Sequence, residues 1–135
     1  MVPKFPLTLL PERFNVSRLP ADAPVPAWAL RSTVLSSATR TNDELSIVCP
    51  ESDVPSGTKT EPGFRAFKLE GPVPFTTTGV IAGLTAPLAA KGLSVFVLST
   101  FDTDYLMVND ATLGGAVAAL RGAGFAVAGT SLPQP

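Results

Sequence analysis

The chain repeats an ordered set of short segments, and this repeat constrains its fold more than any other feature. Residues 14–19 resemble 64–69, and the PVP at 24–26 recurs at 72–74. Further along, residues 34–37 resemble 97–100, and 44–48 resemble 104–108. Because the four segments recur in the same order, the chain is predicted to contain two copies of one structural unit.

The two copies differ mainly in the length between their second and third segments. The second copy is longer there by about four helical turns, at 3.6 residues per turn. Residues 77–92 fill this gap with the apolar side chains of a single helical face, namely Val80, Ile81, Leu84 and Leu88. Pro87 is expected to bend this helix or shift its boundaries. The first copy keeps about one turn, at residues 27–30.

The second copy reads as β-α-β-β-α-β, the order of a ferredoxin-like module. Its strands are predicted at 64–70, 93–100, 105–109 and 125–128, and its helices at 77–92 and 111–122. The first copy is predicted to follow the same plan with both helices eroded, the second to a short turn at 51–57. We therefore expect an α+β chain of two modules, at 1–63 and 64–135. Whether the strand at 64–70 belongs to one module or to both stays open.

Charge and hydropathy exclude several classes of partner. The chain has 10 Lys and Arg against 11 Asp and Glu, without a basic stripe, so nucleic acid is not an expected partner. Polybasic membrane binding is excluded for the same reason. The chain shows no secretory signal and no apolar run of membrane-spanning length. A cytoplasmic protein is the expectation that remains.

Residue content also argues against an enzyme. Histidine is absent, which removes the commonest general base and metal ligand. Cys49 is the only cysteine, so no disulfide or thiolate metal site is expected, and we interpret it as a packed structural residue. Asp102 and Asp104 could share one face of an extended segment, but no base or phosphate-binding loop accompanies them. No cofactor and no metal are expected.

The segment STFDTD, residues 99–104, is the polar turn between two apolar strands. In the predicted module this turn and the loop before the first helix lie at the same sheet edge. Helix N-terminal N–H groups bind carboxylates, and Gly79 would allow close approach of a ligand. If this ligand also carries an ammonium group, Asp104 or Asp102 would face it. The structural alternatives are that Thr77 or Thr78 is a simple N-cap and that Asp102 is a turn residue.

Two long segments resemble the small ACT-domain proteins of the aspartate-kinase-like class. One is PVPFTTTGVIAGLTAPLAAKGLSVFVLSTFDTDYLMV in the second copy, and the other is ATRTNDELSIVCPE in the first. Related double-ACT proteins include the CASTOR arginine sensors, which carry more modules, so arginine is not implied as the ligand here. Finding both segments in this order is more specific than a lone motif.

The resemblance implies two tandem ACT modules that sense a free amino acid at an interface between modules, in a homodimer. The alternative is a protein-interaction or dimerisation module without a ligand. Both readings imply a non-enzymatic regulatory protein. The expected ligand-binding residues come from the loop before the long helix and from the polar turn, and they are Thr78, Gly79, Val80, Ser99, Thr100, Phe101, Asp102 and Asp104.

Overall fold

The computed structural model describes residues 4–129, which form two compact units. The small unit comprises residues 12–64, and the large unit comprises residues 4–11 and 65–129. The small unit ends at residue 64, and residues 4–11 belong with the C-terminal part of the chain. The mixture of strands and helices confirms the predicted α+β class.

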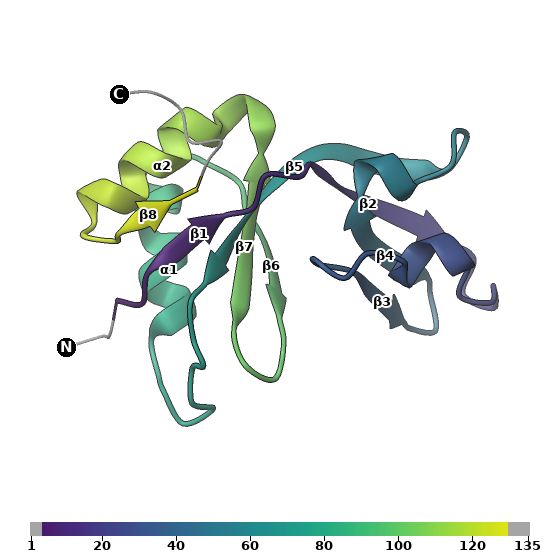
Figure 1. Ribbon diagram of the computed structural model, residues 1–135, viewed down its shortest axis with the longest axis horizontal. Helices are drawn as coiled ribbons and strands as arrows, with labels where there is room; N and C mark the ends of the chain where they lie inside the picture. The colour runs from purple at the N-terminus through teal and green to yellow at the C-terminus, as the bar shows by residue number, and fades with distance from the viewer. Residues whose placement is uncertain (1–3, 130–135) are drawn as a thin grey trace. The chain divides into compact units, whose positions relative to one another are not determined.

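The small unit is a four-stranded antiparallel sheet with two short 3₁₀ turns (Figure 1). Its strands lie in the order β3-β4-β2-β5, and only the first half of β5 takes part. In chain order the elements are β2 (Phe14–Leu19), η1 (Ala27–Leu30), β3 (Ser37–Arg40), β4 (Leu45–Pro50), η2 (Glu51–Asp53) and β5 (Lys59–Leu69). The sequence predicted two shortened helices in this unit, and the single turns η1 and η2 lie at those two places.

Alternate residues of β4 build the core of the small unit. Leu45, Ile47 and Cys49 point to one face, and each is at most 1% exposed. Ala29 of η1 packs against them, with Trp28 partly buried beside it. A single 3₁₀ turn therefore covers the sheet face that a longer helix covers in the large unit.

The large unit has five strands in the order β8-β1-β5-β7-β6, with two α-helices (Figure 1). Side chains of both helices share one core with inward-facing residues of β1, β5, β7 and β8, so both helices lie on the same sheet face. The elements are β1 (Leu7–Leu9), the second half of β5, α1 (Val80–Ala90), β6 (Phe96–Ser99), β7 (Asp104–Asn109), η3 (Asp110–Thr112), α2 (Leu113–Gly122) and β8 (Val127–Ala128).

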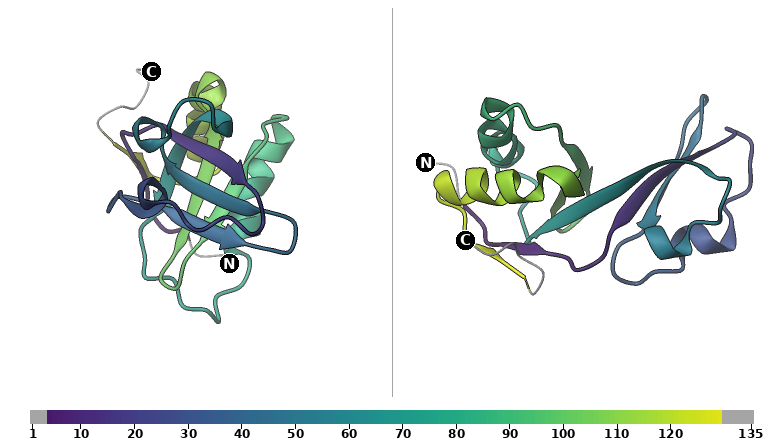
Figure 2. Two further views of the ribbon diagram at one scale, coloured as in Figure 1. Left: turned by 90° about the vertical axis from the view of Figure 1, so that its right-hand side faces the viewer. Right: turned by 90° about the horizontal axis from the view of Figure 1, so that it is seen from above.

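Strand β1 was not predicted, and it is inserted between β5 and β8. It pairs antiparallel with β5 and parallel with β8, and Figure 2 shows it running beside β5. Leu7 and Leu9 are each 1% exposed and belong to the large core. The run LTLL is too short for its apolar pattern to predict a buried strand. Its place in the sheet depends on pairing with β5 and β8, which lie far away in the sequence.

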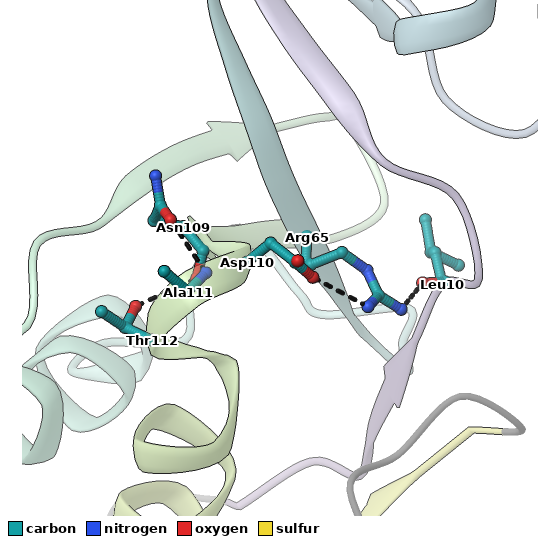
Figure 3. A network of polar contacts seen from close by, with 6 residues as sticks. All are labelled: Leu10, Arg65, Asn109, Asp110, Ala111 and Thr112. Carbon is teal, nitrogen blue, oxygen red and sulfur yellow. Dashed lines mark hydrogen bonds and ion pairs between the residues drawn. The ribbon is translucent and has the colours of Figure 1, made fainter.

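A buried arginine joins three segments of the large unit (Figure 3). Arg65 is 6% exposed, and its guanidinium donates to Oδ1 of Asp110 and to the carbonyl of Leu10, each at 3.3 Å. Asp110 opens η3 directly before α2, where Asn109 accepts a hydrogen bond from the N–H of Ala111 at 2.9 Å. Arg65 thus ties β5 to the end of β1 and to the start of α2.

The expected match between residues 34–37 and 97–100 is wrong in register. Strand β3 begins only at Ser37, and residues 34–36 precede it. A local turn explains the difference, because the Ser32 hydroxyl accepts from the N–H of Val34 and the Ser32 carbonyl accepts from Ser36 Oγ, both at 3.1 Å. The likeness of VLSS to VLST therefore does not reflect structural equivalence.

Within residues 4–129, no helix combines the length and the apolar composition that a bilayer span needs.

Candidate functional site

Two loops of the large unit are joined at the edge of its sheet. The loop between β5 and α1 covers residues 70–79, and the turn between β6 and β7 covers residues 100–103. The N–H of Val73 donates to the carbonyl of Asp102 at 2.7 Å, and Thr103 Oγ1 donates to the carbonyl of Leu69 at 2.5 Å. The predicted proximity of these two loops is confirmed.

Between these loops and the start of α1 lies a cleft of about 350 Å³. Among the described residues that line it, Asp104 alone carries a charge, and the others are apolar or hydroxyl-bearing. The lining comprises Val73, Pro74, Phe75, Thr77, Gly79, Val80, Ile81, Ala82, Ser99, Thr100, Phe101, Thr103 and Asp104.

Helix α1 begins at the cleft with a glycine in the N-cap position. Gly79 has φ of 79°, in the left-handed region that a Cβ disfavours, and it provides no side-chain cap. The expectation that Thr77 or Thr78 caps this helix is therefore wrong. Because no side chain caps the helix, its first N–H groups are available to an anionic group in the cleft.

Asp104 supplies the negative charge of the cleft. It begins β7 directly opposite Ser99 of β6, and the Ser99 hydroxyl donates a hydrogen bond to Asp104 Oδ1. In the part of the chain that the structure describes, no Lys or Arg forms an ion pair with Asp104. A half-buried carboxylate without a cationic partner is suited to bind an ammonium group.

Part of the cleft lining is apolar and open to solvent. Phe75 is 75% exposed and Phe101 is 79% exposed, and their rings meet edge to face with centroids 5.0 Å apart and planes at 89°. Ile81, on the first turn of α1, is 38% exposed. These are the only large hydrophobic side chains exposed among the described residues of the large unit, and all three line the cleft.

Six of the eight residues predicted to bind a ligand line this cleft, and two do not. The six are Gly79, Val80, Ser99, Thr100, Phe101 and Asp104. Asp102 lines a neighbouring cleft of about 340 Å³ instead, together with Lys68 and Glu70. Thr78 is exposed and lines neither cleft.

Sequence reasoning missed Phe75 and Ile81. Ile81 had been placed on the apolar face of the helix, although it lies at the edge of that face and reaches the cleft. Phe75 follows the segment GPVP, and the two prolines indicate an extended loop in which an aromatic side chain can stay exposed. That signal was present but does not distinguish an exposed Phe from a core Phe.

Thr100 is a turn residue, as a comparison of the two hairpins shows. The β6–β7 turn is closed by Thr100 N–H donating to the Thr103 carbonyl at 2.8 Å, while Thr100 Oγ1 accepts from Thr103 N–H at 3.2 Å. In the small unit, Thr41 N–H donates to the Glu44 carbonyl at 2.9 Å, and Thr41 Oγ1 accepts from Glu44 N–H at 3.2 Å. The two four-residue turns share one hydrogen-bond pattern.

The turn match aligns Ser99 with Arg40 and Asp104 with Leu45, since these pairs close the two hairpins. Phe101 corresponds to Asn42. The turn backbone is therefore common to both copies. The residues that distinguish the large unit are Ser99, Phe101 and Asp104.

Cys49 belongs to the small unit and is not among the residues that line this cleft. Its side chain is fully buried, and this burial, together with the negative charge of Asp53, raises the pKa of its thiol from 9.0 to about 11. A thiol with a raised pKa is a poor nucleophile at neutral pH. Within the described residues, no group of three or more His, Cys, Asp or Glu side chains could hold a metal ion.

Comparison with known proteins relates both parts of the chain to known domains. Residues 59–122 match the family model of the ACT domain, and residues 12–57 match a model described as an N-terminal domain. The crystal structure of protein Atu0741 from Agobacterium tumefaciens is similar over 99% of both chains, with 35% identity and a TM-score of 0.89. No curated protein sequence matches the chain.

Two structures of the aspartate kinase class share the fold at low identity. The ligand-free regulatory subunit of aspartate kinase from Thermus thermophilus has a TM-score of 0.64 and 11% identity, with 90% of this chain and 99% of that one covered. Aspartokinase III of E. coli in complex with aspartate and ADP gives the same TM-score and identity, with 90% of this chain and 34% of that one covered. At 35% identity over 99% of both chains, the chain belongs to the same protein family as Atu0741, and its residues 59–122 match the ACT domain.

Proposed function

We propose that this protein is a regulatory ACT protein that binds a free amino acid in the cleft at the start of α1. The observation that carries the proposal is that one cleft holds both an uncapped helix N-terminus and a carboxylate with which no described Lys or Arg forms an ion pair. The residues after Gly79 provide the first and Asp104 provides the second. The fold shared with E. coli aspartokinase III, which was solved with aspartate, adds support.

The cleft offers one group for each charged end of a free amino acid. The α-carboxylate would accept hydrogen bonds from the N–H groups at the start of α1, where the helix dipole also favours negative charge. The α-ammonium would bind the Asp104 carboxylate, which Ser99 holds in place through its hydroxyl. A charge-assisted bond at each end would orient the ligand with its side chain toward Phe75 and Phe101.

The proposal includes the arrangement of modules. We propose that residues 12–64 are a degenerate ACT-like module, because their hairpin turn repeats the bonding of the second one and their strand order is that of a ferredoxin-like sheet. We also propose that the chain is related to the CASTOR sensors through this tandem arrangement of modules. We further propose a homodimer in which a module of the second copy closes the open side of the cleft, so that the site is an interface. We propose that the protein regulates other proteins and catalyses no reaction itself.

A thermal-shift panel of the twenty amino acids tests the proposed ligand class. We expect at least one amino acid to raise the melting temperature, because a ligand that binds only the folded state stabilises it. The shift should disappear in Asp104→Ala and shrink in the matched Asp104→Asn variant. A flat panel with a well-folded protein would count against amino-acid binding.

The second candidate function is a ligand-free interaction or dimerisation module. A groove of about 690 Å³ on the helical side of the large unit favours it, because small and apolar residues of both helices line it. Its lining comprises Pro87, Ala90, Lys91, Leu93, Gly115, Ala118, Ala119, Gly122 and Ala123. Small residues permit close approach of another surface.

Sedimentation analysis with Ala118→Glu tests this candidate. Ala118 is exposed, so the charge should leave the fold intact and disrupt only an association that uses the groove. A dimer that becomes a monomer in Ala118→Glu, in a protein with a flat amino-acid panel, would favour the interaction module. Ala86→Glu, on the exposed side of α1 outside the groove lining, is the matched control.

A further inference from the structure

The apolar wall of the cleft indicates which amino acids it can hold. We propose that the cleft selects an amino acid with an uncharged, apolar side chain and rejects acidic and basic ones. This inference rests on the proposed function and deepens it. Its basis is the gathering of Phe75, Ile81 and Phe101 at one cleft in which Asp104 is the single charged lining residue within the described chain.

Charge excludes the acidic amino acids first. The side chain of aspartate or glutamate would bring a second carboxylate into a cleft that already holds Asp104 and that no described Lys or Arg lines. Like charges at close range repel, and desolvating the added carboxylate would find no compensating cation. An acidic ligand is therefore expected to bind weakly.

The same count of charges disfavours lysine and arginine. Each carries two cationic groups, whereas the described lining offers the single carboxylate of Asp104. The second cation would find no carboxylate in the described lining, and a contact with an exposed aromatic ring would offset only a small part of the cost of removing it from water. A ligand with a neutral side chain carries one cationic group, the α-ammonium, and this group pairs with the one carboxylate of the described lining, Asp104.

The aromatic pair provides the attractive part of the selection. Phe75 and Phe101 expose most of their ring area to water, so a ligand that covers them removes apolar surface from solvent. The two rings stand on the loops that the bond from Val73 N–H to the Asp102 carbonyl holds together. The wall is therefore formed before a ligand arrives, which lowers the entropic cost of binding.

The volume of the cleft agrees with a single small ligand. About 350 Å³ lies at the low end of the roughly 300–1,000 Å³ that small-molecule sites occupy. With the two ends of the amino acid at α1 and Asp104, the larger side chains of the remaining lining are Val73, Phe75, Ile81 and Phe101, beside the hydroxyl-bearing Thr77, Thr100 and Thr103. The side chain of a branched aliphatic or aromatic amino acid is apolar and can pack against the apolar residues of this lining.

Calorimetric titration of the 135-residue chain with leucine, phenylalanine, aspartate, glutamate and lysine tests the selection. We expect leucine or phenylalanine to bind about tenfold or more tightly than the three charged amino acids. Phe101→Ala should weaken binding of the apolar amino acid by about tenfold. Phe101 is 79% exposed, so its replacement should leave the fold intact. Leu30→Ala, which removes an exposed apolar side chain outside the cleft, is the matched control and should change nothing.

Two analogues separate the apolar contribution from the charged ends. Phenethylamine lacks the carboxylate of phenylalanine and 3-phenylpropanoate lacks the ammonium, so each should bind at least tenfold more weakly than phenylalanine. Tightest binding of a charged amino acid, with loss in Asp104→Asn, would overturn the selection and leave the proposed function standing. Equal binding of all five would overturn it too. No binding of any amino acid would overturn both.

Discussion

Asp104 and Ser99 owe their roles to their position at the first pair of a hairpin. Aspartate is disfavoured in strands, yet Asp104 opens β7 and accepts a hydrogen bond from the Ser99 hydroxyl directly across. At the corresponding pair of the small unit, Arg40 donates to the carbonyls of Ala21 and Ala23, and Leu45 is buried in the core. The same two backbone positions therefore serve structure in one unit and face a cleft in the other.

Cys49 gives a prediction for stability at high pH. Its folded pKa of about 11 lies above the usual 9.0, so between these values the unfolded chain loses the thiol proton while the folded chain keeps it. Stability is thus lost as the pH rises through this interval, by about 2 kcal/mol near its upper end. Urea unfolding at pH 8 and pH 10.5 measures this loss.

Cys49→Ala is the control, because it removes the titrating thiol and leaves the other ionisable groups. The difference in stability between the variant and the native chain should shift in favour of the variant as the pH rises. A difference that stays constant between the two pH values would contradict the raised pKa.

At the scale of elements, the site depends on where α1 begins and on how the β6–β7 hairpin turns. Gly79 places the start of α1 at the cleft, and the turn carries Phe101 beyond the end of the sheet. The sequence predicted both elements and their shared edge, because periodicity and chain order determine them. It did not predict the N-cap, because Thr77 and Thr78 fit the cap preference and only the backbone angle of Gly79 excludes them.

The matched turns give the second prediction. Thr41→Val and Thr100→Val each replace a hydroxyl that accepts a backbone N–H at 3.2 Å with a methyl group. Each substitution should cost about 1 kcal/mol of stability, and the two costs should be similar, because both turns are partly or fully open to water. Denaturant unfolding of both variants measures the costs.

The same pair of variants also decides the role of Thr100, which was predicted as a ligand residue. Thr100→Val should retain amino-acid binding once the loss of stability is taken into account. Loss of binding without loss of stability would show that the hydroxyl contacts the ligand and not the turn.

At the scale of the whole molecule, two units share the strand β5. Residues 59–64 pair with β2 in the small unit, and residues 67–69 pair with β1 in the large unit. The large unit also needs β1, which comes from the other end of the chain and precedes the small unit entirely. The C-terminal copy therefore depends for its core on residues outside the expected range of 64–135.

Strand β1 gives the third prediction. Leu7→Ala and Leu9→Ala should each cost about 2–5 kcal/mol, because both side chains are 1% exposed in the large core. The double variant should remove most of the roughly 5–15 kcal/mol of a typical domain and unfold the large unit. Thr8→Ala, between them and half-buried on the other face, should cost far less. Similar costs for all three positions in denaturant unfolding would show that β1 is not part of the core.

The sequence by itself determined the α+β class, the β-α-β-β-α-β order of the second copy, and the loops that meet at the cleft. These follow from local periodicity, which near neighbours set, and from the likeness of segments that repeat along the chain. Only the tertiary structure decided that residues 7–9 are inserted between β5 and β8, that Phe75 and Phe101 meet outside the core, and that Asp104 lacks a cationic partner among the described residues. Each of these features depends on contacts between residues far apart in the chain, and a local sequence pattern does not predict such contacts.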